Sequence, residues 1–109
     1  MNKIIADKNI SDNLIDTFLK FQKKTSFRDF DLKYLTLGMC GEMGEVANEV
    51  KKMERDDNGV LTDERRHKII TELGDVMWYI GGLCNSLDIS FNDLFINNMK
   101  KIGKIVNKI

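Results

Sequence analysis

Residues 56–59 read Asp-Asp-Asn-Gly and separate two long segments in which apolar residues recur at the helical period. The first segment is Asp31–Arg55 and the second is Thr62–Leu87. A cluster of Asp, Asn and Gly marks a turn, and Thr62, followed by two acidic residues, is typical of a helix N-terminus. Since a short connection places two helices side by side and antiparallel, the sequence predicts a helical hairpin that folds back near residue 58.

Two further helices are expected on either side of this hairpin. Ser11–Lys24 repeats apolar residues at the helical period. From Ser90 to the C-terminus a similar pattern follows the string Ser-Phe-Asn-Asp, which is typical of a capping box with Asp93 in place of Glu or Gln. No segment shows a convincing strand pattern. The sequence therefore predicts one all-α domain of four helices, spanning residues 1–109.

The composition disfavours several classes of protein. Lys plus Arg and Asp plus Glu each number 17, so the net charge is zero and no basic field is available for a nucleic acid polymer. No stretch approaches the roughly 18 apolar residues of a membrane span, and residues 1–10 lack the pattern of a signal peptide. We therefore expect a cytoplasmic protein, with Cys40 and Cys84 as reduced, buried thiols.

Two pairs of acidic residues stand out in the hairpin. Glu42 and Glu45 are three residues apart, as are Glu72 and Asp75, so each pair lies on one face of its helix. Both pairs border the apolar stripe of their helix on the same rotational side, and both are equally far from the turn. An antiparallel hairpin would therefore bring the four carboxylates together. Because such acids repel each other, and because hard oxygen ligands suit Mg²⁺ or Mn²⁺, the pattern predicts a divalent-cation site.

An exposed, solvated face is the alternative for these acids. Lys68 precedes Glu72 by four residues and Glu49 precedes Lys52 by three, which are the spacings of ordinary surface ion pairs. Glycines favour the cation site, because each destabilises a helix by about 0.8–1 kcal/mol relative to Ala. Close helix approach, or room for a ligand, would compensate for the six glycines of the two hairpin helices: Gly38, Gly41, Gly44, Gly74, Gly81 and Gly82.

The last two predicted helices offer further candidates. Asn98 lies within the apolar face of the last helix and Lys101 along one flank, where an amide and a row of lysines could bind phosphates and a sugar. A buried Asn with lysines in solvent is the alternative. Trp78 lies opposite the apolar stripe of its helix, which leaves packing on the first helix, a subunit interface or a nucleobase. Tyr79 lies near Glu72 and is a candidate pocket wall.

These residues resemble the MazG-like, all-α nucleoside triphosphate pyrophosphohydrolases, whose pattern is ExxE, a spacer and ExxD. Here 26 residues separate Glu45 from Glu72. The resemblance covers about residues 35–105 and includes the following strings: Gly41-Glu42-x-Gly44-Glu45-Val46, Lys51-Lys52, Glu72-Leu73-Gly74-Asp75-Val76-x-Trp78-Tyr79 and Asn98-x-x-Lys101. One departure is Lys104, which stands near the place where many relatives have an Arg and an aromatic residue.

The resemblance implies a four-helix MazG-like bundle that forms a homodimer or homotetramer. It also implies Mg²⁺-dependent hydrolysis of a nucleoside triphosphate to the monophosphate and pyrophosphate, as in nucleotide-pool housecleaning. The catalytic, metal-binding residues would then be Glu42, Glu45, Glu72 and Asp75, and the substrate-binding residues Lys51, Asn98, Lys101 and, as the pocket wall, Tyr79.

Several alternatives stay open at this level. The carboxylate that accepts a proton from water could be Glu45 or Glu49. Phosphoribosyl-ATP cleavage uses the same scaffold, and the preferred base and sugar are not revealed. A catalytically silent helical module that oligomerises and binds partners is an alternative of another class. A di-iron protein is disfavoured, because His67 does not complete the Glu-x-x-His pairs that such proteins use.

Overall fold

The computed structural model describes residues 13–26 and 31–107, and within these ranges it contains four α-helices and no strand. The helices are α3 (Leu14–Thr25), α4 (Leu32–Asp56), α5 (Asp63–Leu87) and α6 (Phe91–Asn107). The all-α prediction with four helices is therefore confirmed. The first helix ends one residue later than expected, and its expected start at Ser11 lies outside the described residues.

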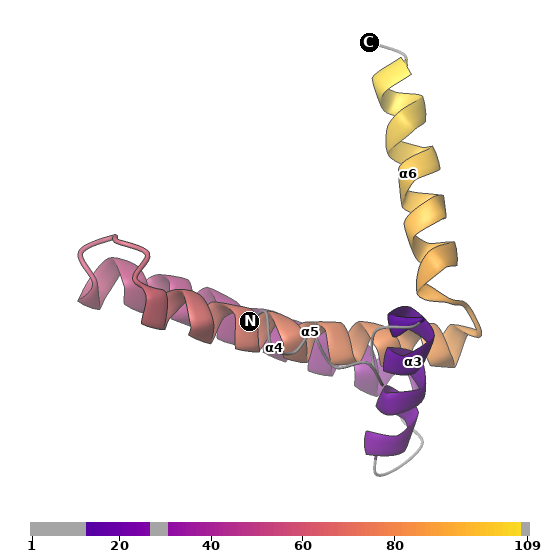
Figure 1. The fold of residues 1–109 in the computed structure, drawn as a ribbon, viewed down its shortest axis with the longest axis horizontal. Coiled ribbons are helices and arrows are strands. Elements are labelled where there is room, and N and C mark those ends of the chain that lie inside the picture. The colour runs from indigo at the N-terminus through magenta and orange to yellow at the C-terminus, as the bar shows by residue number, and fades with distance from the viewer. Residues whose placement is uncertain (1–12, 27–30, 108–109) are drawn as a thin grey trace.

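Helices α4 and α5 form the predicted hairpin and lie side by side and antiparallel along most of their length (Figure 1). At the C-terminal end of α4, the carbonyl oxygen of Met53 accepts hydrogen bonds from the backbone N–H of Asp57 at 3.0 Å and of Gly59 at 3.2 Å. Asn58 and Gly59 adopt the left-handed backbone region, with φ values of 57° and 72°. Glycine and asparagine enter this region most easily, which explains why the chain reverses here.

Side-chain caps fix the starts of the helices, as the sequence predicts. Thr62 Oγ1 accepts a hydrogen bond from the backbone N–H of Arg65 at 3.1 Å, at the start of α5. At the start of α6, Ser90 and Asp93 each accept a hydrogen bond from the other's backbone N–H, both at 3.1 Å. Asp can therefore complete a capping box in the place of Glu or Gln.

Helix α3 crosses α5 at two adjacent glycines. A Cβ on Gly82 would lie 2.8 Å from Gln22 Nε2 and 2.8 Å from Leu35 Cδ2, so a larger residue would force these side chains to shift. Gln22 is only 3% exposed, and its Oε1 accepts a hydrogen bond from Asn85 Nδ2 at 2.9 Å. Close helix approach therefore compensates for the helix-destabilising glycine at this crossing.

Trp78 also packs on α3. Its indole Nε1 donates a hydrogen bond to Thr25 Oγ1 at 2.8 Å, and its ring lies edge-on to Tyr79 with centroids 5.1 Å apart. Of the three alternatives for Trp78, the structure therefore supports packing on the first helix.

The apolar core is small and lies where α3, α4, α5 and the first turn of α6 meet. Its most buried members among the described residues are Leu35, Val76, Cys84 and Phe91. The prediction of a buried thiol holds for Cys84 but is wrong for Cys40, which is exposed. Five residues separate Cys40 from Leu35, which is a rotation of about 140° around the helix, so Cys40 faces away from the core.

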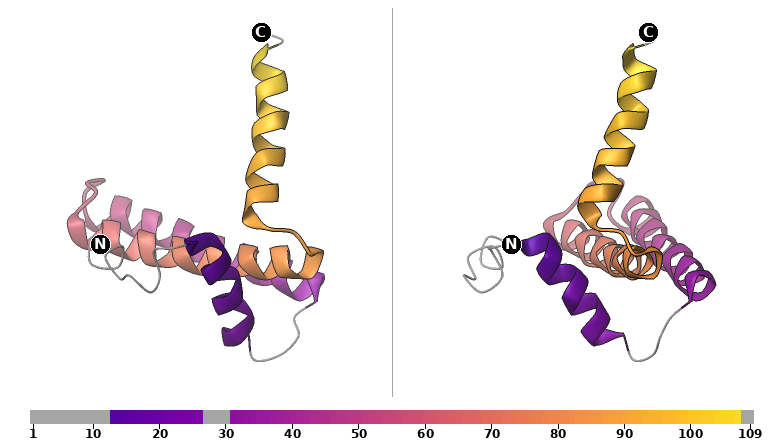
Figure 2. Two further views of the ribbon diagram at one scale, coloured as in Figure 1. Left: turned by 45° about the vertical axis from the view of Figure 1, so that its right-hand side comes forward. Right: turned by 90° about the vertical axis from the view of Figure 1, so that its right-hand side faces the viewer.

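Helix α6 leaves the hairpin at the C-terminal end of α5 and extends away from it (Figures 1 and 2). Asp88 has a left-handed φ of 55°, and the N–H of Ile89 bonds the carbonyl of Cys84 at 3.0 Å, which ends α5 sharply. The ring of Phe91 packs against Phe18 at 6.1 Å. Beyond this first turn the apolar side chains of α6 are exposed: Leu94, Phe95, Ile96, Met99, Ile102 and Ile105.

In the described part of the chain, no helix is both long and apolar enough to cross a membrane.

Candidate metal centre

Three of the four predicted acids converge between α4 and α5. One carboxylate oxygen each of Glu42, Glu72 and Asp75 lies within 4.8 Å of the other two, and we call these three residues the acid centre. Glu42 comes from α4, whereas Glu72 and Asp75 share one face of α5. The turn near residue 58 sets the two helices level, which is why residues 30 positions apart meet.

The electrostatics of the acid centre are repulsive. The pKa of Glu42 is raised above its usual 4.5, first by burial and then by the charges of Asp75 and Glu45. Burial likewise raises the pKa of Glu72, and the carboxylates around it add to the effect, Asp75 most of all. A bound divalent cation would neutralise this repulsion, and an all-oxygen donor set suits a hard cation such as Mg²⁺.

Glu45 stands beside the acid centre rather than within it. It is exposed, and it brings no oxygen within the spacing that joins the other three acids. Its charge still raises the pKa of both Glu42 and Glu72, so it is close enough to act on them. The structure thus arranges the four predicted acids as three plus one.

The helix surface beside the acids is open. A Cβ added to Gly41, Gly44 or Gly74 would meet nothing within 4 Å, and each of these glycines is next in sequence to one of the predicted acids. Gly81 and Gly82, in contrast, have side chains of α3 within 4 Å of such a Cβ. Close helix approach therefore does not compensate for these three positions in the single chain, whereas room for a ligand would.

Tyr79 lies near the acid centre, because the charges of Glu42 and Asp75 act on its hydroxyl. Its ring lies where a Cβ of Gly38 would be, so this glycine allows the ring to approach the backbone of α4 closely. Burial raises the pKa of the Tyr79 hydroxyl, with smaller contributions from Tyr34, Glu42 and Asp75. The side chain therefore lies close to the acids, as its position in the sequence suggests.

The other predicted substrate residues do not meet the acid centre within one chain. Lys51 is exposed on α4, on the turn side of the acids. Asn98 and Lys101 are exposed in the middle of α6, and this helix leads away from the hairpin (Figure 1). The alternative of a buried Asn98 therefore does not hold in the single chain. The roles of these three residues stay predictions.

A model of the MazG nucleotide pyrophosphohydrolase domain matches residues 30–108. The chain belongs to the MazG nucleotide pyrophosphohydrolase family. The MazG match includes α4, α5 and α6, and therefore both acid pairs, whereas α3 lies outside it. Membership supports an enzyme of the pyrophosphohydrolase type, and the acid centre is a group of side chains that could hold its metal.

Among curated proteins, the Gene 37 protein of Mycobacterium phage L5 is 48% identical to this chain over 71 residues. The aligned residues are 65% of this chain and 62% of the phage protein, so the chain spans less than two thirds of that relative's length. No solved structure gives a significant match to this MazG-family chain.

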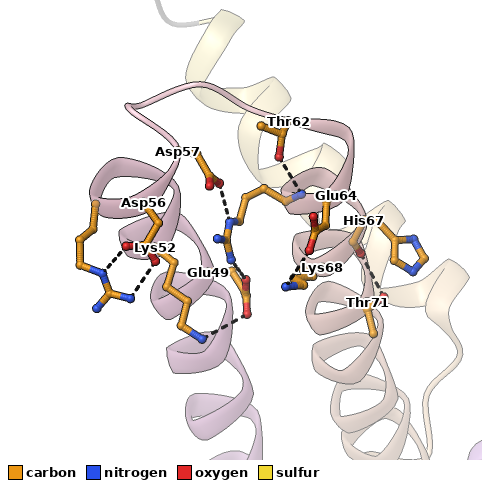
Figure 3. Close-up of polar contacts among 11 residues, drawn as sticks. Glu49, Lys52, Asp56, Asp57, Thr62, Glu64, His67, Lys68 and Thr71 are labelled. Carbon is orange, nitrogen blue, oxygen red and sulfur yellow. Dashed lines mark hydrogen bonds and ion pairs between the residues drawn. The ribbon is translucent and has the colours of Figure 1, made fainter.

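One group of charged residues was missed in the sequence. Arg65, on the first turn of α5, reaches across to α4 and binds Glu49 at 2.6 Å, and it also binds Asp57 in the turn at 2.8 Å (Figure 3). The level argument, which folds the hairpin near residue 58, places Lys68 rather than Arg65 opposite Glu49, so it would not have found this pair. Lys68, in contrast, pairs with Glu64 at 3.3 Å rather than with Glu72.

Proposed function

We propose that this chain is a Mg²⁺-dependent nucleoside triphosphate pyrophosphohydrolase that converts a ribo- or deoxyribonucleoside triphosphate and water to the monophosphate and pyrophosphate. The observation that carries this proposal is the convergence of three carboxylates within 4.8 Å beside an open helix surface. Family membership supports the reaction type. Mn²⁺ is expected to replace Mg²⁺, because both are hard cations with oxygen ligands.

In the proposed reaction the acid centre holds the cation. A bound Mg²⁺ would supply neutralisation of the phosphate charges and a water molecule of lowered pKa. The water oxygen forms a bond to phosphorus while the anhydride bond between the α- and β-phosphates breaks, and pyrophosphate leaves with the electron pair. Lys51 and Lys101 are proposed to offset the charge on this leaving group, and Asn98 to contact phosphate or sugar.

Glu45 is the better candidate for the base that accepts the proton of the attacking water. It is exposed next to the acid centre but outside it, so its oxygens are not all committed to a cation. Glu49, the other candidate, already binds Arg65 with one oxygen at 2.6 Å and lies 3.8 Å from Lys52 with the other. Both oxygens of Glu49 therefore already face a cationic side chain, whereas no ion pair of Glu45 is found among the described residues.

The direct test is product analysis. The protein is incubated with each common ribo- and deoxyribonucleoside triphosphate and Mg²⁺, and the products are separated by ion-exchange chromatography. We expect monophosphate and pyrophosphate, with the fastest substrate naming the base, and no turnover in excess chelator. Diphosphate with orthophosphate would contradict the assigned bond. Absence of turnover with every nucleotide, phosphoribosyl-ATP included, would favour a silent helical module.

We further propose that the working form is a homo-oligomer. The radius of gyration is 16.6 Å, whereas a compact chain of this length has about 13 Å. An open apolar hollow of about 270 Å³ at the foot of α6 continues its exposed apolar face, and its lining residues are Leu14, Ile15, Phe18, Met77, Phe91 and Phe95. A second copy is the natural cover, because a net charge of zero leaves no repulsion between copies. In an oligomer, α6 of one copy could lie over the acid centre of another.

This proposal is tested with a matched pair of substitutions on α6. Ile102 is 51% exposed within the apolar face, and Asn97 is exposed on the lysine flank. We expect Ile102→Lys to reduce the mass measured by light scattering to that of one chain, and Asn97→Lys to leave it at the oligomer mass. A wild-type protein with the mass of a single chain at all concentrations would contradict the proposal.

A further inference from the structure

The turn end of the hairpin holds a second group of charges that the proposed reaction does not use. Arg65 binds Glu49 Oε2 at 2.6 Å with Nη1 and Asp57 Oδ2 at 2.8 Å with Nε. Lys52 Nζ lies 3.8 Å from the other oxygen of Glu49. The side chains of Arg65 and Glu49 are only 11% and 12% exposed, so this ion pair is shielded from solvent more than those on the surface.

Glu49 belongs to the same acidic face of α4 as the predicted metal ligands. It follows Glu45 by four residues and Glu42 by seven, and these spacings stack side chains along one side of a helix. The charge of Glu49 also reaches Glu72, whose pKa is raised by burial first and then by four surrounding carboxylates, of which Glu49 is one. An unpaired Glu49 would therefore be a further acid at the edge of the acid centre.

Arg65 is well placed to keep Glu49 paired and away from the acid centre. Its backbone N–H is bonded to Thr62 Oγ1 at 3.1 Å, so the residue sits in the capped first turn of α5 and its position is fixed. Its planar guanidinium binds one carboxylate from α4 and one from the turn at the same time (Figure 3). A lysine could not hold both with the same geometry.

We propose that Arg65 is a positioning residue for the cation site: by binding Glu49 it keeps this additional carboxylate away from the acid centre and so sets how many cations bind and how tightly. The proposal rests on the proposed function, because it needs a divalent cation at the acid centre. It goes beyond that function by assigning a role to a residue that touches neither cation nor substrate. A purely structural role, in which Arg65 only closes the turn, is the competing explanation.

The test measures Mn²⁺ binding to the full chain, without nucleotide, by electron paramagnetic resonance and calorimetry. We expect Arg65→Gln to bind Mn²⁺ about tenfold more tightly or at one additional site, because Glu49 is released toward the acid centre. The double variant Arg65→Gln with Glu49→Gln should return to the wild-type number of sites and affinity. Arg55→Gln is the matched control, since Arg55 binds Asp56 through a similar fork but is exposed.

A structural role gives a different result. It lowers the melting temperature of the Arg65→Gln variant but leaves Mn²⁺ binding unchanged, or weakens it in a way that Glu49→Gln does not restore, and either result overturns the proposal. If Arg65→Gln does not fold, Arg65→Lys, which cannot hold both carboxylates, takes its place. Tighter or additional Mn²⁺ binding that Glu49→Gln removes supports the proposal, and wild-type binding overturns it. A wild-type chain that binds no Mn²⁺ overturns the cation site itself, whereas wild-type binding with an unaltered Arg65→Gln variant overturns only the role of Arg65.

Discussion

The middle and the turn end of the α4–α5 hairpin carry the same kind of residue in opposite surroundings. At the turn end, Glu49 and Asp57 both bind the guanidinium of Arg65. In the middle, the three carboxylates of the acid centre face one another, and no ion pair to a lysine or arginine involves them in residues 13–26 and 31–107. Paired acids stabilise a fold, whereas unpaired acids held together destabilise it, and such an arrangement is typical of a binding site.

Glu42→Gln should break this contrast with the largest effect. If the acid centre holds the catalytic cation, the substitution lowers the rate of pyrophosphate release by at least on the order of 100-fold. It also removes a repulsive charge, so the melting temperature in chelator should stay equal or rise. Glu64→Gln is the control, because Glu64 is exposed and only pairs with Lys68 on the surface. A Glu42 variant that loses activity and also melts at a lower temperature than the wild type would argue for a structural role.

Two glycines of α5 differ in the room around them, which gives a second test of the difference between the acid centre and the packed part of the hairpin. Gly74 adjoins the acid centre and has open space around it, whereas a Cβ on Gly82 would lie 2.8 Å from Leu35 and from Gln22. We expect Gly82→Ala to lower the free energy of unfolding by about 1–3 kcal/mol through overpacking. Gly74→Ala should raise it by about 0.8–1 kcal/mol through helix propensity. Urea denaturation of both variants measures this, and a loss of stability in Gly74→Ala would show that its surroundings are filled.

The dependence of stability on pH gives the smallest effect. The pKa of Glu42 is raised in the folded chain, by burial and then by Asp75 and Glu45. The folded chain thus holds this proton more tightly than the unfolded chain, and the contribution of Glu42 to stability falls as the pH rises from 4.5 through the raised value. In chelator, the excess in melting temperature of Glu42→Gln over the wild type should grow across this window and then level off.

The pKa of Asp56 is shifted in the opposite direction, so its contribution to stability changes with pH in the opposite way. The hydrogen bond from Arg55 lowers the pKa of Asp56 below its usual 3.8, so its contribution to stability is lost only as the pH falls through the lowered value. The two windows therefore do not overlap. A melting-temperature difference between Glu42→Gln and the wild type that is constant across pH would contradict the raised pKa of Glu42.

Local rules were enough to predict the helices and the turn between them. Thr62, Ser90 and Asp93 mark helix starts by hydrogen bonds within three residues, and Asn58 and Gly59 mark the turn by their backbone freedom. Once the turn is placed, counting residues from it also brings three of the four predicted acids together. Such features depend on neighbours in sequence and on helix geometry alone.

Features that depend on packing between distant residues were not predicted. The exposure of Cys40 follows from which face of α4 meets α3 and α5, and an apolar neighbourhood in the sequence does not specify this face. The choice of Arg65 as the partner of Glu49 depends on side-chain reach across two helices. The direction of α6 depends on the connection after α5 and on whatever covers its apolar face.

Because of this short connection, a tilt of α6 moves the residues at its far end more than those near α5. Only Asp88, Ile89 and Ser90 join it to α5, and its first turn alone is seated in the core. At a rise of about 1.5 Å per residue, a tilt of about 10° at the joint would move Asn98 by roughly 2 Å and Lys104 by more than about 3 Å. A molecule that binds the far end of α6 and tilts the helix would therefore displace its side chains, and the displacement would increase with their distance from residues 88–90.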